Sequence, residues 1–221
     1  MVRQTEQVTV IPMFPLQSVL LPGSPLQLQV FEPRYRALLA DVLADGSGRF
    51  GVVLIERGRE VGGGDDRADV GTVAEIVRHA QLPDGRSHLV CLGTDRIRVR
   101  RWLHDDPYPQ AEADIWPDEP VPSDIDWAQV CRPVAERVDR LWEIHCTAAE
   151  LAGTDPGDTP FPPPGIDSAT ALWSYAAASP IGDADRYRVL CAPDPVTRAE
   201  VLAAALDDAE PLYRLRLLGE T

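Results

Sequence analysis

Residues 14–35 constrain the possible folds more than any other part of the 221-residue chain. Residues 14–23 place apolar side chains between prolines, and proline fixes the backbone angle φ and lacks an N–H donor. Residues 26–30 then alternate apolar side chains with glutamines, which is the period of a half-buried strand. Pro33 follows at a typical first position of a helix. The segment therefore predicts a stiff apolar loop that cannot pair fully in a sheet, then a strand and a helix.

The remainder of residues 8–118 is patterned mostly as strands. The predicted helix carries apolar residues at 38, 39, 42 and 43, and Gly46 is expected just after its end. Pro83-Asp84-Gly85 is typical of a tight turn between two strands. The apolar runs predict strands at 50–55, 70–80, 87–92, 97–102 and 110–116. Many short strands with one helix indicate a small, partly open barrel.

The hydrophobic period becomes helical after residues 117–122. The predicted helices cover about 124–152, 167–178, 184–191 and 195–208, and Asp194 is expected to cap the last one. Residues 153–165 hold five prolines and predict a loop. We therefore predict an α+β protein. Residues 1–118 form a β-rich pseudo-barrel with one inserted helix, and residues 119–221 form a C-terminal helical bundle.

The opening segment resembles the start of the Lon substrate-binding domain, the N-terminal domain of the ATP-dependent Lon protease. Similar stretches recur at 50–54, 70–76 and 93–99, and the similarity fades after Tyr108. The resemblance implies a PUA-like barrel followed by a helical bundle, and a role in binding protein substrates. The matching residues are Phe14, Pro15, Leu16, Val19, Leu20, Pro22, Gly23, Leu26, Leu28, Phe31, Glu32, Pro33, Arg34 and Tyr35.

The chain contains no lysine, and its 21 basic residues are all arginine. An ATPase P-loop needs a lysine for phosphate, whereas Gly62-Gly63-Gly64 runs into two aspartates. A serine-lysine peptidase needs a lysine as its base. The lack of lysine therefore excludes the ATPase and peptidase chemistry of Lon. We predict a protein that is not an enzyme and uses no cofactor.

Other chemical motifs are weak. The four cysteines (Cys91, Cys131, Cys146 and Cys191) form no C-x-x-C pair, so we expect no metal site. His145 and Cys146 are helix neighbours that point in different directions, which argues against a catalytic dyad. No apolar run reaches the length of a membrane span, and no secretory signal is evident. The expectation is a reduced cytoplasmic protein without membrane contact.

The apolar loop is the predicted peptide-binding site. Four such side chains would gain about 8 kcal/mol at about 2 kcal/mol each, against an association cost of roughly 4–15 kcal/mol. We expect weak, sequence-tolerant capture of unfolded or apolar polypeptide segments. The predicted contacts are Phe14, Leu16, Val19, Leu20, Leu21 and Pro22. Glu32, Pro33, Arg34 and Tyr35 are predicted to form the helix start and a local ion pair, without a catalytic role.

The leading hypothesis is a protein-binding module of protein quality control that hands clients to a separate ATP-dependent protease or acts alone. One alternative is nucleic-acid binding through a strand face with Arg96, Arg98 and Arg100, which the net charge of −14 opposes. Another is a small-molecule pocket between barrel and bundle, lined by residues 117–122 and by the helix with Trp142.

Overall fold

The computed structural model describes residues 9–57, 66–155 and 168–218. The chain divides into two compact units, residues 1–117 and residues 118–221. The glycine run at 62–64, the first residue of the helix predicted at 167–178 and most of the proline-rich segment 153–165 lie outside the described residues. Among the described helices, none combines the length and the apolar character that a membrane span requires.

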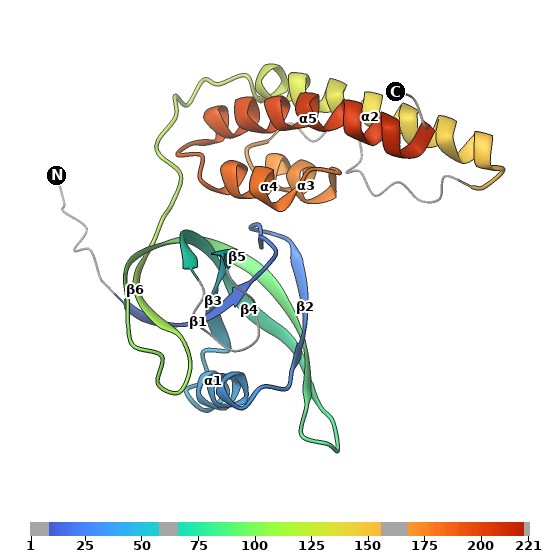
Figure 1. Ribbon diagram of the computed structural model, residues 1–221. Coiled ribbons are helices and arrows are strands. Elements are labelled where there is room, and N and C mark those ends of the chain that lie inside the picture. Colours follow the sequence, from blue (N-terminus) through green and yellow to red (C-terminus); the bar gives the residue numbers. More distant parts are fainter. Residues whose placement is uncertain (1–8, 58–65, 156–167, 219–221) are drawn as a thin grey trace. The chain divides into compact units, whose positions relative to one another are not determined.

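The first unit is a six-stranded barrel with one helix (Figure 1). The strands follow the order β2-β5-β4-β3-β1-β6, and a pairing of β5 with β6 closes the sheet. Helix α1 lies across one end of the barrel. The prediction of an α+β fold with a β-rich pseudo-barrel is confirmed. The elements are β1 (Thr9–Leu16), β2 (Pro25–Val30), α1 (Pro33–Ala44), β3 (Arg49–Arg57), β4 (Asp66–Gln81), β5 (Ser87–Trp102) and β6 (Gln110–Ile115).

Strand β1 corrects the prediction that a loop begins at Phe14. Residues 9–12 pair with β6, and residues 13–16 pair with β3 in parallel, so Pro12 and Pro15 both lie in a paired strand. Each half of β1 has a ladder partner on one side only. On the unpaired side of β1, a residue without an N–H removes no hydrogen bond of the sheet. A strand can accept proline at such positions. The loop is confined to residues 17–24.

Strand β5 corrects the prediction of two strands at 87–92 and 97–102. It runs without a break through Gly93, which lies in the gap between the two predicted strands. A Cβ on Gly93 would lie 2.4 Å from the Leu21 carbonyl oxygen. The Gly93 N–H donates to the Ser24 carbonyl and its own carbonyl accepts from the Gly23 N–H. The glycine thus marks a close approach of two backbones, and the same residue type suits a turn equally well.

The core of the barrel unit joins α1 to the strands. The apolar stripe of α1 is buried at Leu38, Leu39 and Val42, whereas Leu43 is 42% exposed. Helix α1 starts at Pro33 as expected, and Gly46 follows its end with a φ of 74°. The Tyr108 hydroxyl donates to Asp41 at 2.7 Å, and burial, followed by this bond, raises the pKa of Tyr108 to about 12. This bond ties the helix to the segment before β6.

The second unit is helical. Helices α2 (Trp127–Ala152) and α5 (Pro195–Leu218) pack along one another, and the short helices α3 (Ala171–Ala178) and α4 (Asp183–Leu190) complete it (Figure 1). The Asp194 carboxylate accepts from the backbone N–H groups of Val196 and Thr197, which confirms it as the N-cap of α5. The predicted helical region after the barrel is therefore confirmed.

Helix α5 continues ten residues beyond its predicted end at 208, with Pro211 inside it. Contacts with α2 explain why the helix continues. Arg137 pairs with Asp207 at 2.6 Å, Arg140 lies 3.2 Å from Glu210, and the Tyr213 hydroxyl lies 3.2 Å from His145 Nδ1. These tertiary interactions outweigh the local preference of proline for a helix end.

Arg198 is a fully buried charge within the helical unit. Its side chain is 0% exposed, it pairs with Asp118, and its guanidinium lies 3.6 Å from the centre of the Trp173 ring. A buried cation is tolerated only where an anion or an aromatic face compensates its lost hydration. This arrangement fixes α5 against α3 and against the first residue of the unit.

Candidate functional site

The two halves of the opening segment meet in space. The Phe14 ring stacks on the Tyr35 ring with centroids 3.9 Å apart and an interplanar angle of 16°. The Arg34 guanidinium lies over the Tyr35 ring, 4.4 Å from its centroid, and Arg34 Nε lies 3.1 Å from a Glu32 carboxylate oxygen. This packing positions the start of α1 against β1. Glu32 and Arg34 neutralise one another there.

The residues predicted to bind peptide are mostly core. Phe14, Leu16, Leu20 and Leu21 are each at most 8% exposed, whereas Val19 and Pro22 are partly exposed. The barrel buries the first two because β1 extends through the predicted loop. Direct contact of the four buried side chains with a client would require this region to open. The peptide-binding assignment of the loop stays a prediction, and its accessible part is Val19 and Pro22.

A buried hydroxyl anchors the loop to the barrel. The Thr72 side chain, which is 0% exposed, donates to the Leu20 carbonyl oxygen at 2.6 Å. Thr72 lies in β4, which is paired on both sides. The bond therefore connects residues 17–24 to a rigid part of the sheet, and it explains why the loop lies over the core.

A Thr72→Val variant is expected to lose about 1–3 kcal/mol of unfolding free energy, because the Leu20 carbonyl loses a buried donor. Urea unfolding followed by circular dichroism measures the change. Thr72→Ser is the matched control, since it keeps the hydroxyl and removes one methyl group, worth about 0.8 kcal/mol. Equal stability of the valine variant and the unmodified protein would contradict this account.

Strand β2 offers a free backbone edge. Among the described residues it pairs only with β5. Pro25 lies opposite Leu92 and has no N–H, so its position directs its backbone groups away from β5. Because this direction alternates along a strand, Gln27 and Gln29 also turn their N–H and C=O groups to the free side.

A groove of mixed polarity accompanies this edge. It has a volume of about 160 Å³ and is lined by residues 27–30 of β2, by Phe14 and Leu16 of β1, and by Phe31, Glu32 and Tyr35. Phe31 is 52% exposed, a large fraction for an aromatic side chain within the matched segment. The groove therefore combines an unpaired strand edge with an aromatic side chain at its end.

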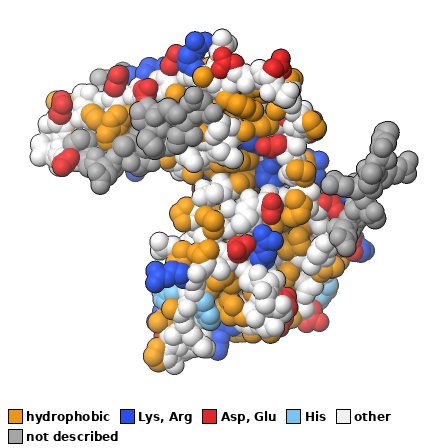
Figure 2. Space-filling model, turned by 180° about the vertical axis from the view of Figure 1, so that it is seen from behind, with side chains coloured by type: hydrophobic (Ala, Val, Ile, Leu, Met, Phe, Trp, Pro, Cys, Tyr) orange, Lys and Arg blue, Asp and Glu red, His pale blue; other side chains and the backbone are white. Residues whose placement is uncertain are grey.

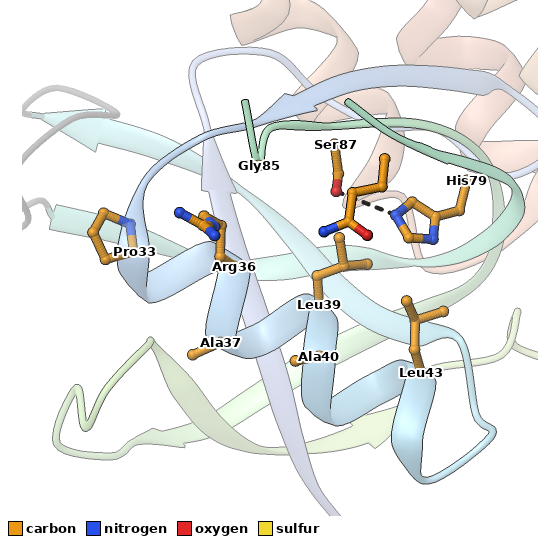
Figure 3. A pocket seen from close by; sticks show the side chains of 10 residues that line it. Pro33, Arg36, Ala37, Leu39, Ala40, Leu43, His79, Gly85 and Ser87 are labelled. Carbon is orange, nitrogen blue, oxygen red and sulfur yellow. Dashed lines mark hydrogen bonds between the residues drawn. The ribbon is translucent and has the colours of Figure 1, made fainter. Parts of the chain in front are cut away.

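A second, larger pocket of about 510 Å³ lies between α1 and the β4–β5 hairpin (Figure 3). Arg36, Leu39 and Leu43 project from α1 toward the hairpin. His79 and Ser87 form the opposite wall, with His79 Nε2 3.2 Å from the Ser87 hydroxyl. None of these residues was predicted to bind a ligand, because they meet only when the hairpin folds over the helix. The available signals were the turn at residues 83–85 and the apolar Leu43.

The exposed apolar side chains are distributed rather than continuous. Figure 2 shows one face of the molecule, on which hydrophobic side chains form several patches between charged ones. Among the described residues of the barrel unit, the large apolar side chains that are more than 40% exposed are Val10, Phe31, Leu43, Val77, Leu92 and Ile115. Small separate patches suit weak contacts with extended chains better than one large permanent interface.

The predicted arginine stripe is occupied by internal partners. Arg96 is only 5% exposed, and Arg96 and Arg98 lie 4.3 and 3.8 Å from the centre of the Trp116 ring. Arg100 pairs with Asp114. A phosphate backbone would have to displace these contacts. Nucleic-acid binding, like a small-molecule pocket as the main role, is therefore not favoured.

The other chemical motifs also have structural partners. His145 stacks on Trp142 and contacts Tyr213, and Asp105 pairs with Arg67 at 2.6 Å. The described residues contain no group of three potential metal ligands. All four cysteines are free thiols, and burial raises the pKa of Cys91 to about 11. That thiol is consequently held in its unreactive protonated form.

Comparison with known proteins places the chain in a family. Residues 10–208 match the model of the ATP-dependent protease La (LON) substrate-binding domain. The Lon protease of Anaeromyxobacter dehalogenans is 30% identical over 156 residues, which are 67% of this chain and 18% of that protein. The Lon protease of Desulfovibrio desulfuricans is 26% identical over 85% of this chain and 21% of its own length. The chain thus spans about a fifth of these relatives.

Solved structures agree with this match. A Lon N-terminal domain protein from Xanthomonas campestris has a TM-score of 0.62 and 29% identity, with coverage of 89% of this chain and 98% of that one. The N-terminal domain of a Lon protease of the Mycobacterium avium complex has a TM-score of 0.60 at 16% identity, covers 90% of this chain and 99% of its own, and supports the fold alone. The chain therefore belongs to the Lon substrate-binding domain family.

Proposed function

We propose that this protein binds exposed apolar segments of client polypeptides and serves as an adaptor or sensor in protein quality control. It works either with a separate ATP-dependent protease or alone. The observation that carries the proposal is the free edge of β2 beside the groove with Phe31. An extended client strand can pair with this edge and place an apolar side chain in the groove, which is a known mode of peptide recognition.

Backbone pairing accounts for sequence tolerance. Every residue except proline presents the same N–H and C=O groups, so the β2 edge recognises an extended conformation rather than particular side chains. Gln27 and Gln29 are exposed and uncharged, and Glu32 neutralises Arg34 at the end of the groove. The occupant that this surface favours is therefore an uncharged, apolar stretch of chain.

The expected affinity is low. Four backbone hydrogen bonds contribute about 1 kcal/mol each. Burial of Phe31 and of the client side chain in the groove contributes about 2 kcal/mol each, so the gain is about 8 kcal/mol. Association costs roughly 4–15 kcal/mol. A single segment is therefore expected to bind with a dissociation constant of about 1 mM or weaker. Such binding releases folded clients and retains chains that expose several segments at once.

Binding is tested by fluorescence anisotropy with a labelled apolar peptide and with a labelled, permanently unfolded polypeptide. We expect saturable binding, and we expect at least a tenfold loss for a peptide that is N-methylated at every second residue, because its pairing edge is blocked. Phe31→Ser should weaken binding about tenfold. Ile115→Ser, which replaces an equally exposed apolar residue of the same unit, should leave it unchanged.

Two results would count against the proposal. The first is an absence of binding up to millimolar concentration. The second is equal affinity for the N-methylated and unmodified peptides, which would exclude pairing at β2. Light scattering of the free protein provides a further check, because a dimer formed through two β2 edges would occupy the same site.

A further inference from the structure

We infer that the pocket between α1 and the β4–β5 hairpin binds the C-terminal carboxylate of a client polypeptide whose last residues are apolar. The inference rests on the proposed function and deepens it, because it assigns a second binding site and a chemical class of ligand end. The charges, the geometry and the apolar wall of the pocket all favour such a ligand (Figure 3).

Arg36 supplies the cation. Among the described residues its side chain makes no hydrogen bond or ion pair, although most described arginines of the barrel unit are paired or stacked on aromatic rings. Its guanidinium lies beside Gly85 at the hairpin turn, where a Cβ would come within 3.1 Å of Nη2. The glycine leaves space in front of the guanidinium. A planar guanidinium with free N–H groups matches the two oxygens of a carboxylate.

The rest of the lining provides no competing anion. None of the described lining residues is Asp or Glu, in a chain with 35 acidic and 21 basic residues. His79 and Gln81 line the hairpin side with Ser87, whose side chain is buried. Because Ser87 engages Nε2 of His79, the imidazole has one nitrogen held and Nδ1 left for a ligand. The pocket is thus electrostatically suited to an anion within an acidic protein.

Helix α1 supplies an apolar wall next to this cation. Pro33, Ala37, Ala40 and Leu43 line the pocket at helical spacing, and Leu43 is 42% exposed. Arg36 and Leu43 are seven residues apart, which corresponds to about 10 Å along a helix axis. Extended chain covers that length in about three residues. A client carboxylate at Arg36 would therefore place the third residue from its end against Leu43.

Two uses of the pocket are distinguished by chemistry. An internal acidic side chain offers a carboxylate too, but its chain continues on both sides and needs room in two directions. A chain end needs only one exit, and the terminal carboxylate has no further residue to accommodate. The end of a chain is also exposed in most unfolded or truncated clients, so this site would complement backbone pairing at β2.

The test uses three labelled ten-residue peptides with the same internal sequence and three apolar residues at the end. One has a free carboxylate, one has a C-terminal amide, and one has the amide with an internal aspartate that restores the charge. Fluorescence anisotropy at constant ionic strength gives the affinities. We expect the free acid to bind about tenfold more tightly than either amide, as a charge-assisted hydrogen bond pair implies.

Variants assign the effect to the pocket. Arg36→Gln should abolish the difference between acid and amide, and Leu43→Ser should weaken both peptides. Arg78→Gln is the matched control, because Arg78 is exposed on β4, lies outside the lining and carries the same charge. It should leave the preference intact. Circular dichroism reports whether each variant folds.

The outcomes separate the two claims. Equal affinity of acid and amide on the unmodified protein overturns the carboxylate site while the proposed client binding stands. If the amide peptide with the internal aspartate binds as tightly as the free acid, the pocket does not select the end of a chain, and that assignment is overturned. If none of the peptides and no unfolded polypeptide binds, both the inference and the proposed function fail. The peptide comparison decides the matter even if Arg36→Gln does not fold.

Discussion

A Gly71→Ala variant is expected to lose at least about 3 kcal/mol of unfolding free energy, because the added methyl group would overlap atoms of the neighbouring strand β3. A Cβ at this position would lie 2.2 Å from the Val52 carbonyl oxygen and 2.7 Å from a methyl carbon of Val53. Gly71 pairs with β3 on one side and with β5 on the other. The backbone therefore cannot move away without breaking a ladder, and the expected cost exceeds that of ordinary overpacking.

Urea unfolding followed by circular dichroism measures the Gly71→Ala effect. Ala80→Ser is the control on the same strand, because Ala80 is exposed and its substitution should change stability by less than about 0.5 kcal/mol. An alanine variant as stable as the unmodified protein would show that β3 and β4 are farther apart than in this structure.

An Asp118→Ala variant is expected to destabilise the helical unit by about 3 kcal/mol, because it leaves the buried Arg198 without its anion. Asp118 is itself 34% exposed, which places the expected loss at the lower end for a buried pair. Adding Arg198→Met to the Asp118→Ala variant should restore more than half of the lost unfolding free energy. The uncompensated charge disappears, while the contact with Trp173 is kept.

Hydrogen exchange measured by mass spectrometry localises the Asp118 effect. Peptides from α3 and α5 should exchange faster in Asp118→Ala and recover in the double variant, whereas β3 and β4 should be unaffected. Asp84→Ala removes an exposed pair with Arg86 and is the control, which should leave the exchange of α3 and α5 unchanged. Failure of the Arg198 change to rescue would mean that the ion pair is not the source of the loss.

The sequence predicted the element types well because most segments follow a clear period. The alternation in residues 26–30, the helix start at Pro33 and the cap at Asp194 are local signals, and each is present in the structure. The errors fall where tertiary contacts override local preference. Gly93 lies in a continuous strand because two backbones meet there, and Pro211 lies inside α5 because α2 holds that helix in place.

The candidate sites were harder to predict than the fold. A sequence of apolar residues at 14, 16, 20 and 21 looks the same whether these side chains contact a client or lie in a core. In the structure they are buried, and the first two are buried because β1 pairs with β3. The free edge of β2 depends on which strands surround it, which a single strand's sequence does not contain. The pocket at Arg36 joins residues about 50 positions apart, whose meeting depends on the path of the hairpin.

The position of β1 also affects how the barrel forms during protein synthesis. Residues 9–12 pair with residues 110–113, so this half of β1 cannot pair until about 100 further residues have been synthesised. At 5–20 residues per second the ribosome needs roughly 5–20 s for that stretch. Over this interval Met13 and Phe14 lack part of the core that later buries them. The nascent chain is then itself an extended, apolar polypeptide in need of a protective partner.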